Sequence, residues 1–344
     1  MAAPLLQVED LSVRFQTEDG VLQAVDGISF AVEQGQTLGI VGESGCGKSV
    51  ANMSILGLTR AENTEISGRT VFEGRDLQQL QSEELERVRG NDIAMIFQDP
   101  LTSLHPFYRI GDQIIEAIQT HRPLDNAAAR ERAVELLELV GIPDPDRRVG
   151  EYPHEFSGGM RQRAMIAMAL ANEPKLLIAD EPTTALDVTI QAQILQLLER
   201  LQQELGMAVI LITHDLGVVA EIAEEVLVMY AGRVVEQGPL DAIFYDPQHP
   251  YTWGLLGSVT RIDRRREGRL PQIKGQPPSL IAPPEGCHFR SRCPYEFDRC
   301  SSVPPLEAGS GDRRHLDRCW LPPDRKRTLR VIEGGEIGLE TPAA

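Results

Sequence analysis

The chain has 344 residues, of which 42% are apolar and 25% are charged, as is ordinary for a folded globular protein. This length predicts two or three domains, and the net charge of −17 argues against a general nucleic-acid-binding surface. No apolar run approaches the roughly 18–20 residues that span a bilayer, and no secretory signal is recognisable. We therefore expect a cytosolic protein that reaches a membrane only through a partner, and whose five cysteines form no disulfides.

Two stretches near the N-terminus alternate apolar and polar residues, Leu5 to Phe15 and Leu22 to Val32. Because Glu18-Asp19-Gly20 lies between them, we expect an antiparallel hairpin or meander. Phe15 lies on the first of these strands, where an aromatic ring is able to stack on an adenine. A core or edge aromatic explains the pattern equally well.

A glycine-rich loop lies between the apolar run Leu38 to Val41, an expected buried strand, and an expected helix from Val50 to Leu58. Its pattern is G-x-x-x-x-G-K-S, the P-loop, in which backbone N–H groups and the helix N-terminus converge on phosphate. We expect Lys48 to reach the β- and γ-phosphates and Ser49 to ligate Mg²⁺. The loop consists of Gly42, Glu43, Ser44, Gly45, Cys46, Gly47, Lys48 and Ser49.

Cys46 lies in this loop next to the start of a helix, where the pKa of a thiol tends to fall. We therefore hypothesise that alkylation of Cys46 blocks nucleotide binding and that ATP protects the thiol. A small residue that merely fills a variable loop position is the alternative.

A second buried strand is expected at 93–97, after a short strand at Gly68 to Asp76 and a charged helix at Ser82 to Arg89. It is followed by Gln98. At the sheet edge that also carries the P-loop, this amide is a candidate Mg²⁺ ligand and γ-phosphate sensor. A simple strand-end cap is the alternative.

Residues 102–169 show helical periodicity and no strand pattern, which indicates a helical subdomain inserted into an α/β core. Within it, Ser157, Gly158 and Gly159 lead into a helix that begins near Ala164. A Ser-Gly-Gly sequence at a helix start is a potential anion site. Taken alone, the motif is better explained as an N-cap.

Two further apolar runs, 176–179 and 208–212, end in polar residues typical of a catalytic sheet edge. Asp180 and Glu181 follow the first run, and we expect Asp180 to hold Mg²⁺ and Glu181 to polarise the attacking water. Asp187 precedes a long amphipathic helix. His214 follows the second run, and a hairpin is expected at 226–237 around Ala231-Gly232.

Taken in order, these motifs resemble the nucleotide-binding subunit of an ATP-binding cassette (ABC) transporter. The resemblance covers roughly residues 5–255, and its most specific element is the Ser-Gly-Gly signature. Beyond it, His249-Pro250-Tyr251-Thr252, Gly275-Gln276-Pro277-Pro278 and the segment 286–295 resemble the C-terminal extension of the dipeptide and oligopeptide importer branch. Met160 stands where many cassettes have Gln, but Met-Arg-Gln is common in this branch.

The resemblance implies an α/β P-loop NTPase fold, with a RecA-like core, an antiparallel β subdomain and an inserted helical subdomain at about 100–170. The cassette would span 1–255 and a cysteine-containing extension 256–344. It also implies that Ser157 and Gly159 serve the ATP of a partner cassette, and that Asp187 couples the two sites. The resemblance further implies that His214 contacts the γ-phosphate, that Phe15 stacks on adenine, and that Gln98 links the site to the helical subdomain.

The implied function is ATP hydrolysis that powers uptake of dipeptides or oligopeptides. The implied partners are a second ATPase subunit (a paralogue in most of the branch), two transmembrane permeases and an extracytoplasmic peptide-binding protein, with no nucleic acid. The chain would lie on the cytoplasmic face of the cell (inner) membrane. The alternatives are an importer of nickel or another small solute, a soluble non-transport ABC ATPase, and an iron–sulfur electron carrier with a vestigial cassette.

Four cysteines lie close together in the Pro-rich C-terminal segment: Cys287, Cys293, Cys300 and Cys319. Four thiols packed into about thirty residues of a cytosolic protein suggest a metal site. The spacing lacks the close pair that begins most zinc sites, whereas iron–sulfur clusters tolerate wider spacing. With the family resemblance, this favours a structural 4Fe–4S cluster, zinc being the alternative and inert thiols the third possibility. His288 and His315 lie nearby and are possible substitutes for a cysteine.

Overall fold

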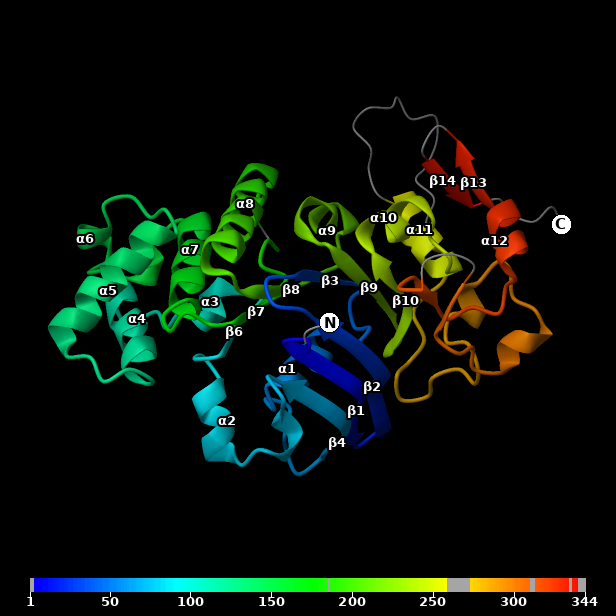
Figure 1. Cartoon of the computed structure of the whole chain (residues 1–344), viewed down its shortest axis with the longest axis horizontal. Coiled ribbons are helices and arrows are strands. Elements are labelled where there is room, and N and C mark those ends of the chain that lie inside the picture. The colour runs from blue at the N-terminus through cyan, green and yellow to red at the C-terminus, as the bar shows by residue number, and fades with distance from the viewer. Residues whose placement is uncertain (1–2, 185, 259–272, 310–312, 334–335, 340–344) are drawn as a thin grey trace. The chain divides into compact units, whose positions relative to one another are not determined.

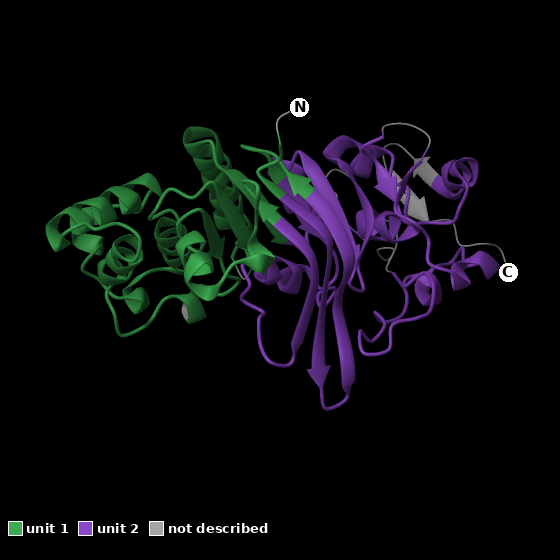
Figure 2. Ribbon diagram, turned by 60° about the horizontal axis from the view of Figure 1, so that its bottom comes forward, with its two compact units in different colours: residues 1–6, 31–37, 71–212 green, residues 7–30, 38–70, 213–344 purple. Residues whose placement is uncertain are grey.

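The computed structural model describes residues 3–184, 186–258, 273–309, 313–333 and 336–339 (Figure 1). The chain divides into two compact units, which are coloured separately in Figure 2. Unit 1 comprises residues 1–6, 31–37 and 71–212, and unit 2 comprises residues 7–30, 38–70 and 213–344. The glycine-rich loop and the cysteine-rich extension therefore belong to the same unit.

Three parallel strands form the core of unit 1: β6 (Ile93–Ile96), β7 (Leu176–Asp180) and, as far as Ile212, β8 (Ala208–Thr213). Nearly every side chain in them is buried, which explains why the sequence shows unbroken apolar runs there. Ile96 is paired with Ala179, and Asp180 with Ile212, so the carboxyl ends of the strands meet at one edge. The expected strand at 93–97 is one residue too long, because Phe97 lies beyond β6 and is 43% exposed.

Helices fill the chain between β6 and β7. They are α3 (Pro100–Ser103), α4 (Ile110–Gln119), α5 (Asn126–Leu139), α6 (Pro145–Arg148), the 3-10 helix η2 (Pro153–Glu155) and α7 (Gly158–Ala169). Helices α4, α5 and α7 pack on one another through buried faces such as Ile110, Ile114 and Ile118 of α4. Unit 1 also contains β5 (Arg75–Asp76), η1 (Leu77–Gln79), α2 (Ser82–Val88) and α8 (Val188–Leu205).

Unit 2 contains β3 (Thr37–Val41) from Leu38 onward, which is parallel to β9 (Glu225–Tyr230). A tight turn connects β9 to the antiparallel strand β10 (Arg233–Pro239). Its two residues, Ala231 and Gly232, both have left-handed φ angles, of 45° and 82°. That is the backbone a two-residue type I′ hairpin needs, and the hairpin expected from the sequence is confirmed.

Around these strands unit 2 carries α1 (Lys48–Ile55), α9 (Leu216–Ile222), α10 (Leu240–Tyr245) and α11 (Pro250–Ser258). It also holds most of β1 (Leu6–Thr17), β2 (Gly20–Val32) and β4 (Thr64–Phe72), with β1 paired between the other two. The extension adds η3 (Arg290–Arg292), η4 (Asp298–Ser301), β11 (Glu307–Ala308), β12 (Leu316–Asp317), α12 (Pro323–Leu329), β13 (Arg330–Glu333) and β14 (Glu336–Leu339).

The extension is joined to β10 by a buried charged pair. Strand β12 runs antiparallel to β10, with Glu236 opposite Asp317. The carboxylate of Glu236 is fully buried; it accepts the backbone N–H groups of Gln248 (2.5 Å) and His249 (3.0 Å) and lies 2.8 Å from Nε2 of His315. A buried carboxylate needs such partners, because burial penalises its charge.

The pairing of His315 with Glu236 predicts that the free energy of unfolding of the extension falls as the pH rises. Burial alone lowers the pKa of His315, but the hydrogen bond and charge of Glu236, with Asp246 and Asp317, outweigh it and raise the pKa above the usual 6.5. The stabilisation is therefore fully present below the unfolded-state pKa of about 6.5 and is lost as the pH rises through the higher folded-state value.

We expect His315→Gln to lower the free energy of unfolding of the extension by about 3 kcal/mol at pH 6, and by less at pH 9. The chain has two tryptophans: Trp253 lies in α11, and Trp320 lies shortly after β12. Their fluorescence during urea unfolding therefore reports on this region. An equal loss at both pH values would show that protonation of His315 does not contribute.

Candidate functional site

The glycine-rich loop (residues 42–49) connects β3 to α1 in unit 2, and its glycines are required by close backbone contacts. A Cβ on Gly42 would lie 2.2 Å from the carbonyl oxygen of Met229, and one on Gly47 would lie 2.2 Å from that of Ala24. Gly47 also has a φ of 102°, a conformation that side chains rarely allow. No other residue fits these positions without shifting the backbone.

Lys48 is the first residue of α1, and its side chain lies back over the loop. It is 5% exposed, and Nζ donates to the carbonyl oxygens of Gly42 (2.7 Å) and Glu43 (3.1 Å). The ammonium group is thus held at the centre of the loop, where a bound phosphate would exchange these neutral acceptors for a charged one. Ser49 follows and is half-buried, whereas Ser44 and Gly45 are exposed.

The expectation that the Cys46 thiol has a lowered pKa is wrong. The residue is 5% exposed, and its burial raises the pKa above the usual value despite the charge of Lys48, whose Nζ lies 3.9 Å from Sγ. The position next to a helix N-terminus suggested the opposite, because the sequence does not reveal that the side chain is enclosed. A buried, protonated thiol is a poor nucleophile, so Cys46 is not set up for rapid alkylation.

In unit 1, Gln98 and Glu181 come together at the carboxyl edge of the parallel strands. Nε2 of Gln98 donates to Oε2 of Glu181 at 2.9 Å, and the hydroxyl of Thr184 donates to the same oxygen at 2.7 Å. Glu181 has a left-handed φ of 48°, and its backbone N–H donates to the carbonyl of Ile212. Such a strained backbone is typical of residues that are oriented for a task. Asp180, the preceding residue, ends β7 and is 6% exposed.

Thr184 was not among the residues singled out from the sequence. Its position three residues after Glu181 was the available signal, since a hydroxyl at that spacing is able to reach back to the carboxylate.

The Ser-Gly-Gly segment and Asp187 lie at the starts of two packed helices in unit 1. Ser157 caps α7 by accepting the N–H of Met160, and Asp187 caps α8 by accepting the N–H of Ile190 at 3.0 Å. A Cβ on Gly159 would lie 2.9 Å from Cγ2 of Ile190, so this glycine permits the close approach of the two helices. Ser157 and Gly158 are exposed at the surface of the unit.

The remaining predicted nucleotide ligands lie in unit 2. Phe15 is half-buried on β1. His214 directly follows β8 and is exposed. The next residue, Asp215, caps α9 by accepting the N–H of Gly217 at 2.8 Å.

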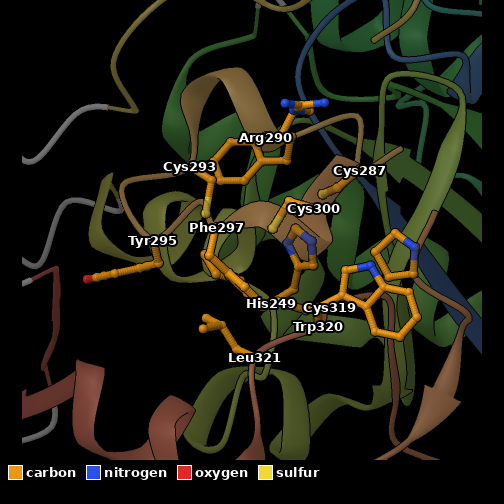
Figure 3. A pocket seen from close by; sticks show the side chains of 13 residues that line it. His249, Cys287, Arg290, Cys293, Tyr295, Phe297, Cys300, Cys319, Trp320 and Leu321 are labelled. Atoms are coloured by element: carbon orange, nitrogen blue, oxygen red, sulfur yellow. The ribbon is translucent and has the colours of Figure 1, made fainter. Parts of the chain in front are cut away.

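All four cysteines of the extension line one small cavity (Figure 3), together with His249, Phe289 and Trp320. The N–H of Cys287 donates to the carbonyl of Cys300, which holds two of the four segments together. Burial raises the pKa of three of the thiols: that of Cys293 rises to about 12, and those of Cys287 and Cys319 also rise. Without a compensating cation these three thiols are therefore protonated.

The two histidines considered as substitute ligands have other partners. Nδ1 of His288 lies 2.8 Å from the carbonyl oxygen of Ala231, and His315 is paired with Glu236. His249, which the sequence analysis did not consider as a ligand, lines the cavity instead; burial lowers its pKa to about 3. Over the described parts of the chain, no group of three or more His, Cys, Asp or Glu side chains is arranged to hold a metal ion.

None of the helices that the structure describes is long and apolar enough to cross a membrane.

Comparisons with known proteins agree with this geometry. The profile of the ABC transporter family matches residues 25–184, and that of the oligopeptide/dipeptide transporter C-terminal region matches residues 235–300. The dipeptide transport ATP-binding protein DppD of Bacillus subtilis is 52% identical over 96% of this chain and 98% of its own length. The oligopeptide transport ATP-binding protein OppD of Escherichia coli is 51% identical over 93% of this chain and 94% of its own.

Among solved structures, a dimeric ATP-binding cassette bound to ADP and phosphate in a post-hydrolysis state superposes with a TM-score of 0.62. It is 26% identical and covers 68% of this chain and 98% of its own. The expected fold class is confirmed. The chain belongs to the ATP-hydrolysing subunits of ABC transporters, in the branch that carries the oligopeptide/dipeptide C-terminal region.

Proposed function

We propose that this ATPase powers the uptake of dipeptides or oligopeptides through a membrane permease. The single observation that carries the proposal is the combination of a P-loop with a C-terminal region that matches peptide transporters over residues 235–300. Its relatives are dipeptide and oligopeptide transport proteins. The chain would act on the cytoplasmic face of the membrane.

The loop 42–49 binds the phosphates of ATP, with Lys48 moving its ammonium group from the loop carbonyls to the β- and γ-phosphates. The hydroxyl of Ser49, the amide of Gln98 and the carboxylate of Asp180 are hard oxygen donors that suit Mg²⁺. Bound there, Mg²⁺ would neutralise charge on the phosphates. Phe15 stacks on the adenine, and His214 contacts the γ-phosphate.

Glu181 accepts a proton from the attacking water. Its carboxylate is oriented for this by two donors on one oxygen, the amide of Gln98 and the hydroxyl of Thr184. Gln98 immediately precedes the helical segment in the chain and contacts the Glu181 carboxylate. It would therefore couple ATP hydrolysis to movement of these helices.

A second cassette completes the site. Ser157, Gly158 and Gly159 would bind the ATP held by the partner's P-loop, with Asp187 coupling the two sites. Val188, the first residue of α8, is 83% exposed next to Asp187, as expected of a residue that a partner covers. We propose that the partner is a paralogue, a copy of this chain being the alternative.

The helical segment offers a preformed surface for a permease. Phe107 is 83% exposed and Tyr108 is 58% exposed. The side chain of Gln113 fixes the loop that carries them: it accepts the N–H of His105 at 2.8 Å and donates to the carbonyls of His105 and Tyr108, both at 3.1 Å. Exposed aromatic side chains on a rigid loop are typical of an interface. Two permeases and an external peptide-binding protein would complete the transporter.

We expect Phe107→Ser to lower peptide uptake at least tenfold in vesicles that contain both ATPases and both permeases, because the substitution removes an aromatic anchor of the interface. The affinity of the purified chain for ATP should not change. Leu205→Ser is the matched control, since Leu205 is 40% exposed at the end of α8 and should tolerate a polar residue. Normal uptake by the Phe107→Ser variant would exclude this loop as the docking surface.

The four cysteines would hold a 4Fe–4S cluster. Thiols are the ligands that such clusters require, and their arrangement around one cavity from four segments suits a group that binds one thiolate per iron. A single zinc ion would draw four sulfurs to within about 3.8 Å of one another. The spacing of the four cysteines lacks the close pair that begins most zinc sites, and this supports the cluster over zinc. When bound, the cluster would supply iron–sulfur bonds that hold these segments together.

Protein purified without oxygen is expected to contain about four irons per chain and to show a broad absorption band at about 400 nm. Cys293→Ser should remove most of the iron, whereas Cys46→Ser, which alters the one cysteine outside the extension, should leave the iron content unchanged. Metal analysis that finds one zinc and no iron would contradict the cluster and leave a zinc module.

A further inference from the structure

Arg292 of the extension forms a two-pronged ion pair with Glu43 of the glycine-rich loop. Nη1 lies 2.7 Å from Oε2 of Glu43, and Nη2 lies 3.1 Å from Oε1. The other N–H groups of the guanidinium donate to the Tyr230 hydroxyl (3.3 Å) and to the carbonyls of Ile273 (3.3 Å) and Lys274 (3.0 Å). All five donors of the side chain are therefore used, and only 5% of it is exposed.

The fit of this site to an arginine is specific. A buried guanidinium is costly unless it is paired, and Glu43 is the carboxylate that pairs with it. Lysine has neither the planar fork nor the five donors. Arg292 is held in place by its own segment, since it lies at the end of η3 and next to Cys293.

Glu43 joins the extension to Lys48. Its backbone N–H donates to the hydroxyl of Tyr251 at 2.9 Å, and Tyr251 is fully buried in α11. Its carbonyl oxygen accepts Nζ of Lys48 at 3.1 Å. The side chain and the N–H of Glu43 are thus fixed by residues C-terminal to the hairpin β9–β10, while its carbonyl orients the phosphate-binding lysine.

We propose that Arg292 is a positioning residue for ATP binding: through Glu43, it holds the glycine-rich loop in the conformation that receives the phosphates. The inference rests on the proposed nucleotide role of this loop. It gives the C-terminal extension a part in the ATP site, so that displacement of the segment around Arg292 weakens binding without any change in the loop itself.

The test is a double-mutant cycle on the full-length chain, with AMP-PNP and Mg²⁺ as the probe. Arg292→Ala and Glu43→Gln should each raise the Kd for AMP-PNP about tenfold, a coupling of ordinary size between linked sites. The double variant should bind no more weakly than the weaker single variant, because both changes break one interaction. In steady-state assays the KM for ATP should rise while kcat stays within about twofold.

Two further variants separate the possible outcomes. Arg69→Ala breaks an exposed Arg–Glu pair in the same unit, in which Arg69 lies 3.1 Å from Glu9, and should leave the Kd unchanged. Lys48→Ala should abolish binding if the proposed nucleotide loop is correct; if it does not, that function fails and this inference with it. Glu43→Gln keeps the size and one acceptor oxygen of the side chain, so it tests the pair even if Arg292→Ala does not fold.

The inference is overturned if Glu43→Gln and a folded Arg292→Ala variant bind AMP-PNP as the wild type does. It is also overturned if the two effects multiply in the double variant, because Arg292 would then act on the fold and not through Glu43.

Discussion

Close approach of backbone segments around residues 42–49 is the constraint on which the nucleotide site depends. The carbonyls of Met229 and Ala24 come so near that only glycine fits at positions 42 and 47. The loop is therefore enclosed by the end of β9 and by β2, and the parallel pairing of β3 with β9 fixes where it starts. This enclosure buries Lys48 and Cys46 and holds the Lys48 ammonium group against the carbonyls of Gly42 and Glu43, next to the expected anion site.

The extension contributes to the same enclosure. Strand β12 lengthens the pairing begun by β9 and β10, and Glu236 joins β10 to His315 and to the start of α11. From α11, Tyr251 reaches Glu43, and from η3, Arg292 does so as well. An ATPase that lacks such an extension must hold its P-loop by other means. Here the segment with the four cysteines contacts the glycine-rich loop directly, through the ion pair of Arg292 with Glu43.

The sequence predicted the elements whose signals are local. Unbroken apolar runs revealed β6, β7 and β8, and the polar residues after them marked the edge where Gln98 meets Glu181. Phe97 was misplaced because an apolar residue at a strand end has the same pattern whether it is buried or exposed. The pKa of Cys46, the place of His249 in the cysteine cavity and the pairing of Arg292 with Glu43 depend on segments distant in sequence, and no local pattern encodes them.

The most direct test of the central claim is peptide uptake by vesicles that contain this ATPase, its partner ATPase and both permeases, with ATP on the side of the ATPases. We expect ATP-dependent accumulation of a labelled peptide by the wild type. We expect none with Glu181→Gln, in which an amide of nearly the same shape replaces the carboxylate and the base is lost, although that variant still binds ATP. Equal uptake with and without the Glu181 carboxylate, or ATP hydrolysis that moves another solute and no peptide, would contradict it.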